Sequence, residues 1–134
     1  MKITKEDILK YFNTAEGFSK HNNIFLETIE KDKVILSCKL TKNSLNPSNI
    51  AHGGLIFGMC DNACGILAYL KGDKAVTINA DINYLRPCHG EYIKCIAYPV
   101  KEGKNIGTYK AEIYNDNEEL SSIMTSTFYF LNEK

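Results

Sequence analysis

A stretch near the middle of the chain, from Leu55 to Leu70, constrains the fold more than any other segment. It reads LIFGMCDNACGILAYL, and Asp61 and Asn62 are its only strongly polar residues. It is too long for a strand and lacks a strand's alternation. It is shorter than the roughly 20 apolar residues of a membrane span, and its polar residues interrupt it. We therefore expect a helix buried on nearly all sides, with no membrane partner.

Segments on both sides of this helix show the alternation typical of β-strands. Within residues 34–40 every even-numbered position is apolar, a period of two. Thr4 with Asp7 gives a weak cap signal before a short helix around Ile8–Phe12. Polar residues 16–23 and 42–50 read as loops. We expect strands over residues 24–29, 34–40, 76–85, 92–100, 106–114 and 120–131, with the last four forming an antiparallel meander.

This order of elements predicts an α+β fold in one domain over residues 1–134. An antiparallel curved sheet wrapped around one long central helix satisfies the pattern, because a helix so apolar cannot lie on an open sheet with one side in water. A partner subunit could supply any cover that the sheet leaves missing.

Composition and charge narrow the class of protein. The chain has 134 residues, of which 44% are hydrophobic and 24% charged. A chain of this length and composition can form a hydrophobic core without disulfide or metal cross-links. Its 16 Lys and Arg equal its 16 Asp and Glu, which argues against a nucleic-acid partner. The N-terminal residues lack the apolar region of a signal peptide. Five irregularly spaced cysteines argue against a disulfide framework, so we expect a cytoplasmic protein.

Cys60 and Cys64 are spaced to share one face of the helix. A metal site would need further ligands at a recognised spacing, and none is near them in the sequence. No histidine lies near Cys60 in the sequence to activate it as a nucleophile. Core packing is the better interpretation of both thiols.

Asp61 is the most informative residue of the predicted helix. Burying an unpaired carboxylate is costly, so such a group persists where it is paired, hydrogen-bonded or functional. Taken alone, Asp61 is explained as well by a structural role, as a satisfied core acid or as part of a thin polar stripe that faces solvent, as by a functional one.

The residues just before the helix favour a functional interpretation. The sequence NPSNIAHGG, residues 46–54, leads directly into it, and Gly53 and Gly54 leave backbone N–H groups uncovered by side chains. The positive end of the helix dipole lies there too, which suits a developing oxyanion. His52-Gly53-Gly54 alone is also compatible with a simple capping turn.

The combined spacing is more specific than any single motif. Asn46 lies six residues before His52-Gly53-Gly54, and Asp61 follows Gly53 by eight residues. The segment DINYLRP at residues 81–87 completes a pattern that resembles the PaaI-like (phenylacetate-degradation-type) acyl-CoA thioesterases of the hotdog fold. The resemblance covers roughly residues 46–130. It implies a hotdog fold and hydrolysis of an acyl-CoA thioester without a metal or another cofactor.

The resemblance also implies roles for individual residues. The Gly53 N–H is expected to donate to the thioester carbonyl, assisted by the Asn46 side chain. Asp61 is expected to activate water or to attack as a nucleophile, with Thr77 helping to hold the water. His52 is expected near the sulfur or the loop that holds it, and Gly54 is expected to contact the substrate.

Two further groups of residues are expected to contact the ligand. Arg86, Lys101 and Lys104 lie in or beside predicted turns, where a long cation could reach the phosphates of CoA. Apolar residues could line the acyl pocket, namely Ile56, Phe57, Tyr69 and Tyr84. Two other function classes stay open at this point. One is a hotdog dehydratase or hydratase that uses His52 and Asp61, and the other is a non-catalytic acyl-CoA sensor.

Helix geometry predicts how the site is assembled. At about 1.5 Å per residue, the backbones of Gly53 and Asp61 lie about 12 Å apart along the axis. A thioester carbonyl and its attacking water are only about 3 Å apart. Two antiparallel helices across a two-fold axis would bring Gly53 of one chain beside Asp61 of the other. We therefore expect a homodimer with shared active sites, assembled further into a tetramer as a dimer of dimers.

Overall fold

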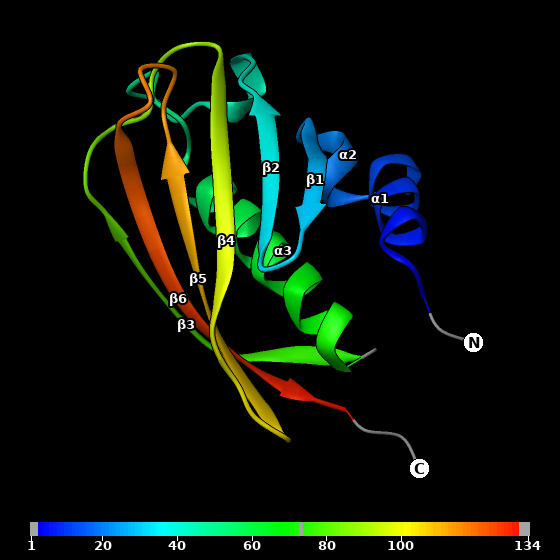
Figure 1. Cartoon of the computed structure of the whole chain (residues 1–134). Helices are drawn as coiled ribbons and strands as arrows, with labels where there is room; N and C mark the ends of the chain where they lie inside the picture. Colours follow the sequence, from blue (N-terminus) through cyan, green and yellow to red (C-terminus); the bar gives the residue numbers. More distant parts are fainter. Residues whose placement is uncertain (1–2, 73, 132–134) are drawn as a thin grey trace.

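The computed structural model describes residues 3–72 and 74–131, and it consists of a curved sheet around one long helix (Figure 1). The strands are β1 (Ile24–Glu30), β2 (Lys33–Lys39), β3 (Ala75–Tyr84), β4 (Tyr92–Glu102), β5 (Ile106–Tyr114) and β6 (Leu120–Phe130). The helices are α1 (Lys5–Thr14), α2 (Phe18–His21) and α3 (Gly53–Gly72), with a 3-10 turn at Lys42–Ser44.

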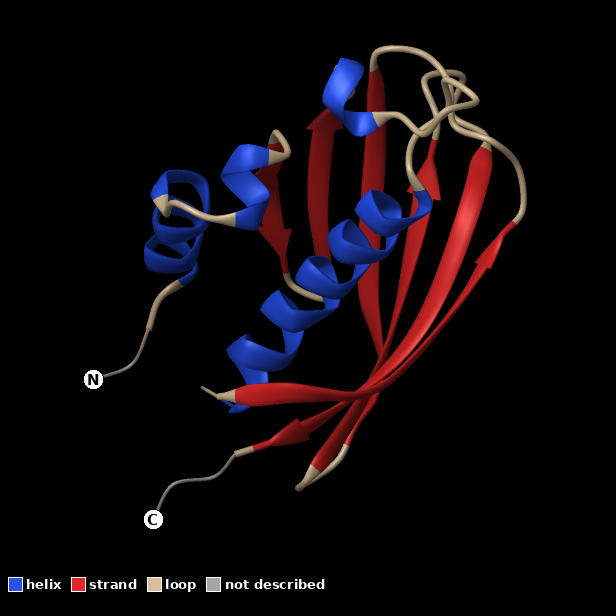
Figure 2. Ribbon diagram, turned by 180° about the vertical axis from the view of Figure 1, so that it is seen from behind, coloured by secondary structure: helices blue, strands red, loops and turns tan. Residues whose placement is uncertain are grey.

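The long helix α3 crosses the concave side of the sheet, as Figure 2 shows. It packs against β2, β3, β4, β5 and β6. Several of its residues have no exposed surface, namely Met59, Cys60, Ala63, Cys64 and Ala68. The central buried helix and the hotdog arrangement are therefore confirmed. The helix begins two residues before the predicted segment and ends two residues after it.

The sheet is antiparallel throughout, in the order β1-β2-β4-β5-β6-β3. The expected four-strand meander is wrong for β3, which pairs with β6 at one edge and not with β4. Tight turns after Glu102 and Tyr114 fold β4, β5 and β6 into hairpins. The longer connection at residues 85–91 instead carries the chain across the sheet to β4 beside β2. Where the chain leaves β3, the Leu85 and Arg86 N–H groups both donate to the Ser121 carbonyl of β6.

Two predicted loops contain short helical turns. Residues 16–23 include α2, whose Phe18 ring lies against Gly58 of α3. The Asn62 side chain on α3 donates to the Ser19 hydroxyl of α2 at 2.7 Å. These contacts explain why Gly58 stands in the long helix, because a Cβ there would lie 2.8 Å from the Phe18 ring. The neighbour that approaches this glycine is thus an aromatic side chain.

Helix α3 is long and apolar enough, by length and composition alone, to cross a membrane. It has 20 residues, so the expectation that the segment is too short for a membrane span is wrong. Half of this stretch is buried inside the molecule. Packing within the curved sheet accounts for its apolar composition, because a helix surrounded by strands needs apolar residues on most sides.

Candidate active site

Asp61 lies in the middle of α3, on a side of the helix that the sheet leaves partly open. The Thr77 hydroxyl on β3 donates to Asp61 Oδ1 at 2.8 Å. No other hydrogen bond or ion pair to Asp61 is formed within residues 3–72 and 74–131, which leaves Oδ2 open to the neighbouring cavity. The two residues that the sequence associates with water activation therefore lie side by side, although they are 16 positions apart in the chain and belong to different elements.

A cavity of about 810 Å³ adjoins the Asp61 carboxylate. Most of its walls are apolar, and residues from α1, α3 and the sheet contribute to it. The lining residues from α3 and the strands are Asp61, Asn62, Gly65, Ile66, Tyr69, Ala75, Thr77 and Phe128, and those from α1 and the residues before it are Ile3, Asp7, Ile8, Tyr11 and Phe12. We call this space the acid cavity. It combines two carboxylates, Asp61 on α3 and Asp7 on α1, with a large apolar surface.

The start of α3 is held in place by backbone contacts. The His52 carbonyl accepts from the N–H groups of Leu55 and Ile56, and the His52 N–H donates to the Ser44 carbonyl. The Gly54 N–H donates to His52 Nδ1 at 2.8 Å, so this expected ligand donor is engaged within the chain. No hydrogen bond from the Gly53 N–H is formed within the described part of the chain. Gly53 therefore presents the open donor at the positive end of α3.

Tyr84 was expected to line the acyl pocket, and its position adds a contact that the sequence does not indicate. Its hydroxyl donates to the Gly53 carbonyl at 2.9 Å, and its ring lies 3.4 Å from where a Cβ on Gly53 would be. Burial raises the pKa of Tyr84, which keeps the phenol protonated and able to donate. Tyr84 comes from the far end of β3, so only the folded sheet brings it to this position.

Asn46 sits in a compact turn just before α3. Its Oδ1 accepts from the N–H groups of Ser48 at 2.9 Å and Ile50 at 3.3 Å. Its Nδ2 forms no hydrogen bond to any other residue that the structure describes. Asn46 and Gly53 line one cavity of about 360 Å³, together with Ile50, Ala51, Ile56, Tyr84, Leu85, Arg86, Pro87 and Cys88. We call this space the donor cavity, because both open N–H groups adjoin it.

The two cavities share no lining residue, so Gly53 and Asp61 do not face one common space within one chain. The separation agrees with about 12 Å of helix between them. The sequence motif thus predicts two half-sites on the same helix, and the fold of a single chain does not join them.

The three candidate cations lie at different places. Arg86 lines the donor cavity and forms an ion pair with Glu119 at 3.1 Å. Lys104 lines a cavity of about 680 Å³ at the C-terminal end of α3, together with Lys71. Lys101 is exposed near the end of β4. The ends of a 20-residue helix lie about 30 Å apart, so Arg86 and Lys104 cannot contact the same phosphate within one chain.

All five cysteines are buried and free. No group of three His, Cys, Asp or Glu side chains among the residues described here could hold a metal ion. Cys60 lies within the core beside Cys95. The hydrogen bond between the two thiols, together with the burial of Cys95, raises the pKa of Cys95. The expectation that Cys60 and Cys64 are core residues is confirmed by their lack of exposed surface.

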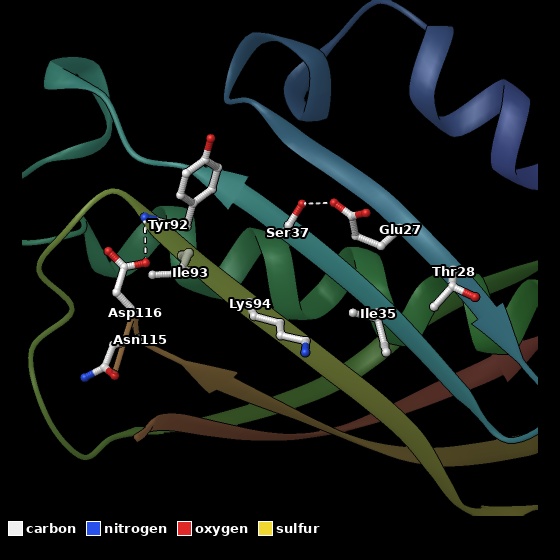
Figure 3. Close-up of a pocket in the computed structure, with 9 residues that line it drawn as sticks. All are labelled: Glu27, Thr28, Ile35, Ser37, Tyr92, Ile93, Lys94, Asn115 and Asp116. Carbon is white, nitrogen blue, oxygen red and sulfur yellow. Dashed lines mark hydrogen bonds between the residues drawn. The ribbon is translucent and has the colours of Figure 1, made fainter. Parts of the chain in front are cut away.

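A separate groove of about 530 Å³ lies on the face of the sheet away from α3 (Figure 3). Tyr92 and Lys94 of β4 extend over it, opposite Glu27 and Ser37 of β1 and β2. Glu27 accepts a hydrogen bond from the Ser37 hydroxyl, and Asp116 accepts from the Tyr92 N–H at 3.1 Å. No residue that lines the donor cavity or the acid cavity also lines this groove, so substitutions in the groove can serve as controls.

The family model of the thioesterase superfamily matches residues 48–122, more than half of the chain. A putative esterase of Archaeoglobus fulgidus is 32% identical over 93 residues, which are 69% of this chain and 60% of that protein. The chain thus spans about three fifths of that relative's length. Acyl-coenzyme A thioesterase PaaI of Escherichia coli is 26% identical over 78% of this chain and 75% of its own.

Solved structures agree with the fold. The thioesterase HI1161 of Haemophilus influenzae superimposes with a TM-score of 0.87 at 18% identity, over 98% of this chain and 93% of that one. The smu.793 protein of Streptococcus mutans, bound to acetyl CoA, has a TM-score of 0.78 at 27% identity, over 84% and 91% of the two chains. Together with the match to the family model, these similarities identify the chain as a member of the thioesterase superfamily.

Proposed function

We propose that the protein hydrolyses an acyl-CoA thioester to a free acid and CoA. The single observation that carries the proposal is the Asp61 carboxylate, which faces a largely apolar cavity while it is oriented by Thr77. Support for CoA as the carrier comes from the acyl-coenzyme A thioesterase PaaI of Escherichia coli and from the acetyl CoA in the Streptococcus mutans structure.

In the proposed reaction, Asp61 acts as a general base. Its Oδ2 takes a proton from water while the water oxygen attacks the thioester carbonyl carbon. The negative charge that develops on the carbonyl oxygen is stabilised by the Gly53 N–H and by Asn46 Nδ2. The carbon–sulfur bond then breaks, and the CoA sulfur receives the proton from the Asp61 carboxyl. Direct attack by Asp61, through a mixed anhydride, uses the same groups.

We propose further that two chains build each active site. β3 is an edge strand, and its exposed Val76 and Ile78 lie beside backbone groups that no other described strand pairs with. Such an edge is a template for pairing with another chain. Pairing of β3 with its own copy about a two-fold axis would run the two α3 helices antiparallel. The donor cavity of one chain could then meet the acid cavity of the other.

This arrangement has a further geometric consequence for α3. If Gly53 of each chain lies beside Asp61 of its partner, the two-fold axis passes near the residue midway between them, Phe57. The Phe57 side chain is 37% exposed, which suits an apolar residue that a second chain would cover. The tetramer and the cytoplasmic location stay predictions.

The test is to measure free thiol released from a panel of acyl-CoA thioesters by the purified chain. Release of CoA from at least one of them supports the proposal. If CoA binds but no thioester is cleaved, the chain is a sensor and the proposal is wrong. Change in ultraviolet absorbance of an enoyl-CoA without thiol release would instead identify a dehydratase or hydratase.

A further inference from the structure

We propose that α1 forms the wall of the acyl-binding pocket and that Tyr11 and Phe12 determine which acyl lengths the protein accepts. The inference rests on the proposed thioester hydrolysis and names the residues that set its specificity. It follows from the position of α1, which lines the acid cavity although it is outside the segment that matches the thioesterase superfamily.

The acid cavity has the composition expected of an acyl pocket. The Asp61 carboxylate and the Thr77 hydroxyl are next to each other on the side formed by α3 and β3. The remaining walls carry mainly aliphatic and aromatic side chains, among them Ile66 and Phe128. An acyl chain whose carbonyl carbon lies near Asp61 would extend into this apolar space, because burying its methylene groups is favourable.

Tyr11 is the most conspicuous residue of this wall. Its side chain is 74% exposed although it lines the cavity, and Tyr69 on the α3 side is 37% exposed. An aromatic ring left in water beside an apolar cavity offers contact area that a bound acyl chain would cover. Phe12, the next residue along α1, is half-buried and packs against the core, so it forms a firmer part of the same wall.

Helix α1 is anchored well enough to act as a wall. Thr4 and Asp7 form a capping box at its start, with both hydrogen bonds at 3.1 Å. Near its end, Asn13 bonds the free edge of β1, donating to the Leu26 carbonyl at 2.9 Å and accepting from the Leu26 N–H at 2.8 Å. Ile8 is buried against the core. These contacts hold α1 in place at its start, in its middle and near its end.

Gly65 marks the opposite side of the pocket. It lies one helical turn after Asp61, and a Cβ there would meet only the Phe128 ring, at an ordinary 3.7 Å. Packing against the sheet therefore does not require glycine at this position, and glycine costs helix stability. The missing side chain instead leaves room in the cavity, one helical turn beyond the carboxylate, where the later carbons of a long acyl chain would lie.

The experiment compares kcat/KM for octanoyl-CoA and acetyl-CoA by thiol release. Tyr11→Ala and Phe12→Ala should each lower the octanoyl-to-acetyl ratio about tenfold, because only the longer chain reaches α1. Gly65→Leu should lower the ratio by at least about tenfold by filling the pocket. Tyr92→Ala, which removes an exposed tyrosine from the opposite face of the sheet (Figure 3), should leave the ratio unchanged.

The outcomes separate this inference from the proposed function. If the wild-type chain releases thiol but the α1 and Gly65 variants keep the wild-type ratio, the inference is wrong and hydrolysis stands. If the wild-type chain cleaves no thioester, the proposed function fails and the inference fails with it. Thermal unfolding guards against misfolding, and a folded Phe12→Tyr variant should retain the ratio that Phe12→Ala loses.

Discussion

The donor cavity and the acid cavity lie along the same helix but offer a thioester different chemistry. The donor cavity is small and presents the Gly53 N–H and the Asn46 amide at the positive end of α3. The acid cavity is more than twice as large and mostly apolar, and the Asp61 carboxylate faces it. One can stabilise negative charge and the other can activate water. About 12 Å of helix separates them, so in the proposed arrangement each chain carries two complementary halves and no complete site.

Removing the carboxylate tests the acid cavity most directly. Asp61→Asn keeps the size of the side chain and an oxygen that can accept from Thr77, but it removes the base. We expect kcat to fall by at least about 10²-fold, the lower end for loss of a general base. Thermal unfolding should be close to that of the wild type. A folded Asp61→Asn chain that retains most of its activity on the best substrate would exclude Asp61 from the chemistry.

The proposal that two chains build each active site is tested by mixing two inactive variants, Asp61→Asn and Asn46→Ala. Loss of one oxyanion donor should lower activity by about 10²-fold, so both parents are nearly inactive. A mixed dimer would contain one site with both defects and one intact site. With random pairing half of the dimers are mixed, so co-expression should restore roughly a quarter of wild-type activity. Mixed dimers that form but stay inactive would show that each chain builds its own site.

How far the sequence predicts these half-sites depends on the kind of contact. The positions of Asp61 and Gly53 on one buried helix were predictable, because the apolar stretch and the glycines at its start are evident in the chain. The role of Tyr84 at the Gly53 carbonyl was not, because it depends on β3 pairing with β6 and not with β4. Tyr11 in the acid cavity was equally hidden, since a short amphipathic helix does not indicate which cavity it will border.

The fold was more predictable than the sheet order. Alternation locates strands such as β5, whose predicted and observed ends agree. It carries no information about which strand lies beside which, because the period of two is the same for every neighbour. The turn residues after β4 and β5 do specify hairpins, whereas the connection from β3 leaves several partners open.

A cysteine at position 57 tests the geometry between the two half-sites. Burial raises the pKa of Cys38 to about 11 and that of Cys64 to about 12, and all five native thiols are buried. Phe57→Cys would therefore add the only exposed thiol. If the two-fold axis passes near this residue, mild oxidation should link two chains into a dimer that a reductant separates. Wild type under the same oxidation is the control.

The opposite result would argue against the proposed axis. A folded Phe57→Cys chain that is dimeric in solution, yet fails to cross-link where Val76→Cys on β3 succeeds, would mean that the helices are too far apart at this point. The dimer would then be formed by the strand edge alone, and the donor and acid cavities would have to meet through a different offset of the two helices.

The smallest expected effect concerns how CoA reaches the two halves. Arg86 lines the donor cavity, whereas Lys104 lies at the opposite end of α3. If the CoA phosphates bind at the donor side, Arg86→Ala should raise KM for acyl-CoA by up to about fivefold, the scale of an exposed charge pair, with little change in kcat. Lys101→Ala and Lys104→Ala should leave KM nearly unchanged. Because Arg86 also pairs with Glu119, Glu119→Gln serves as the matched control for losing that ion pair alone.

A KM that rises for Lys104→Ala and not for Arg86→Ala would place the nucleotide at the other end of the helix. Unchanged KM in all three would mean that none of these cations contacts CoA.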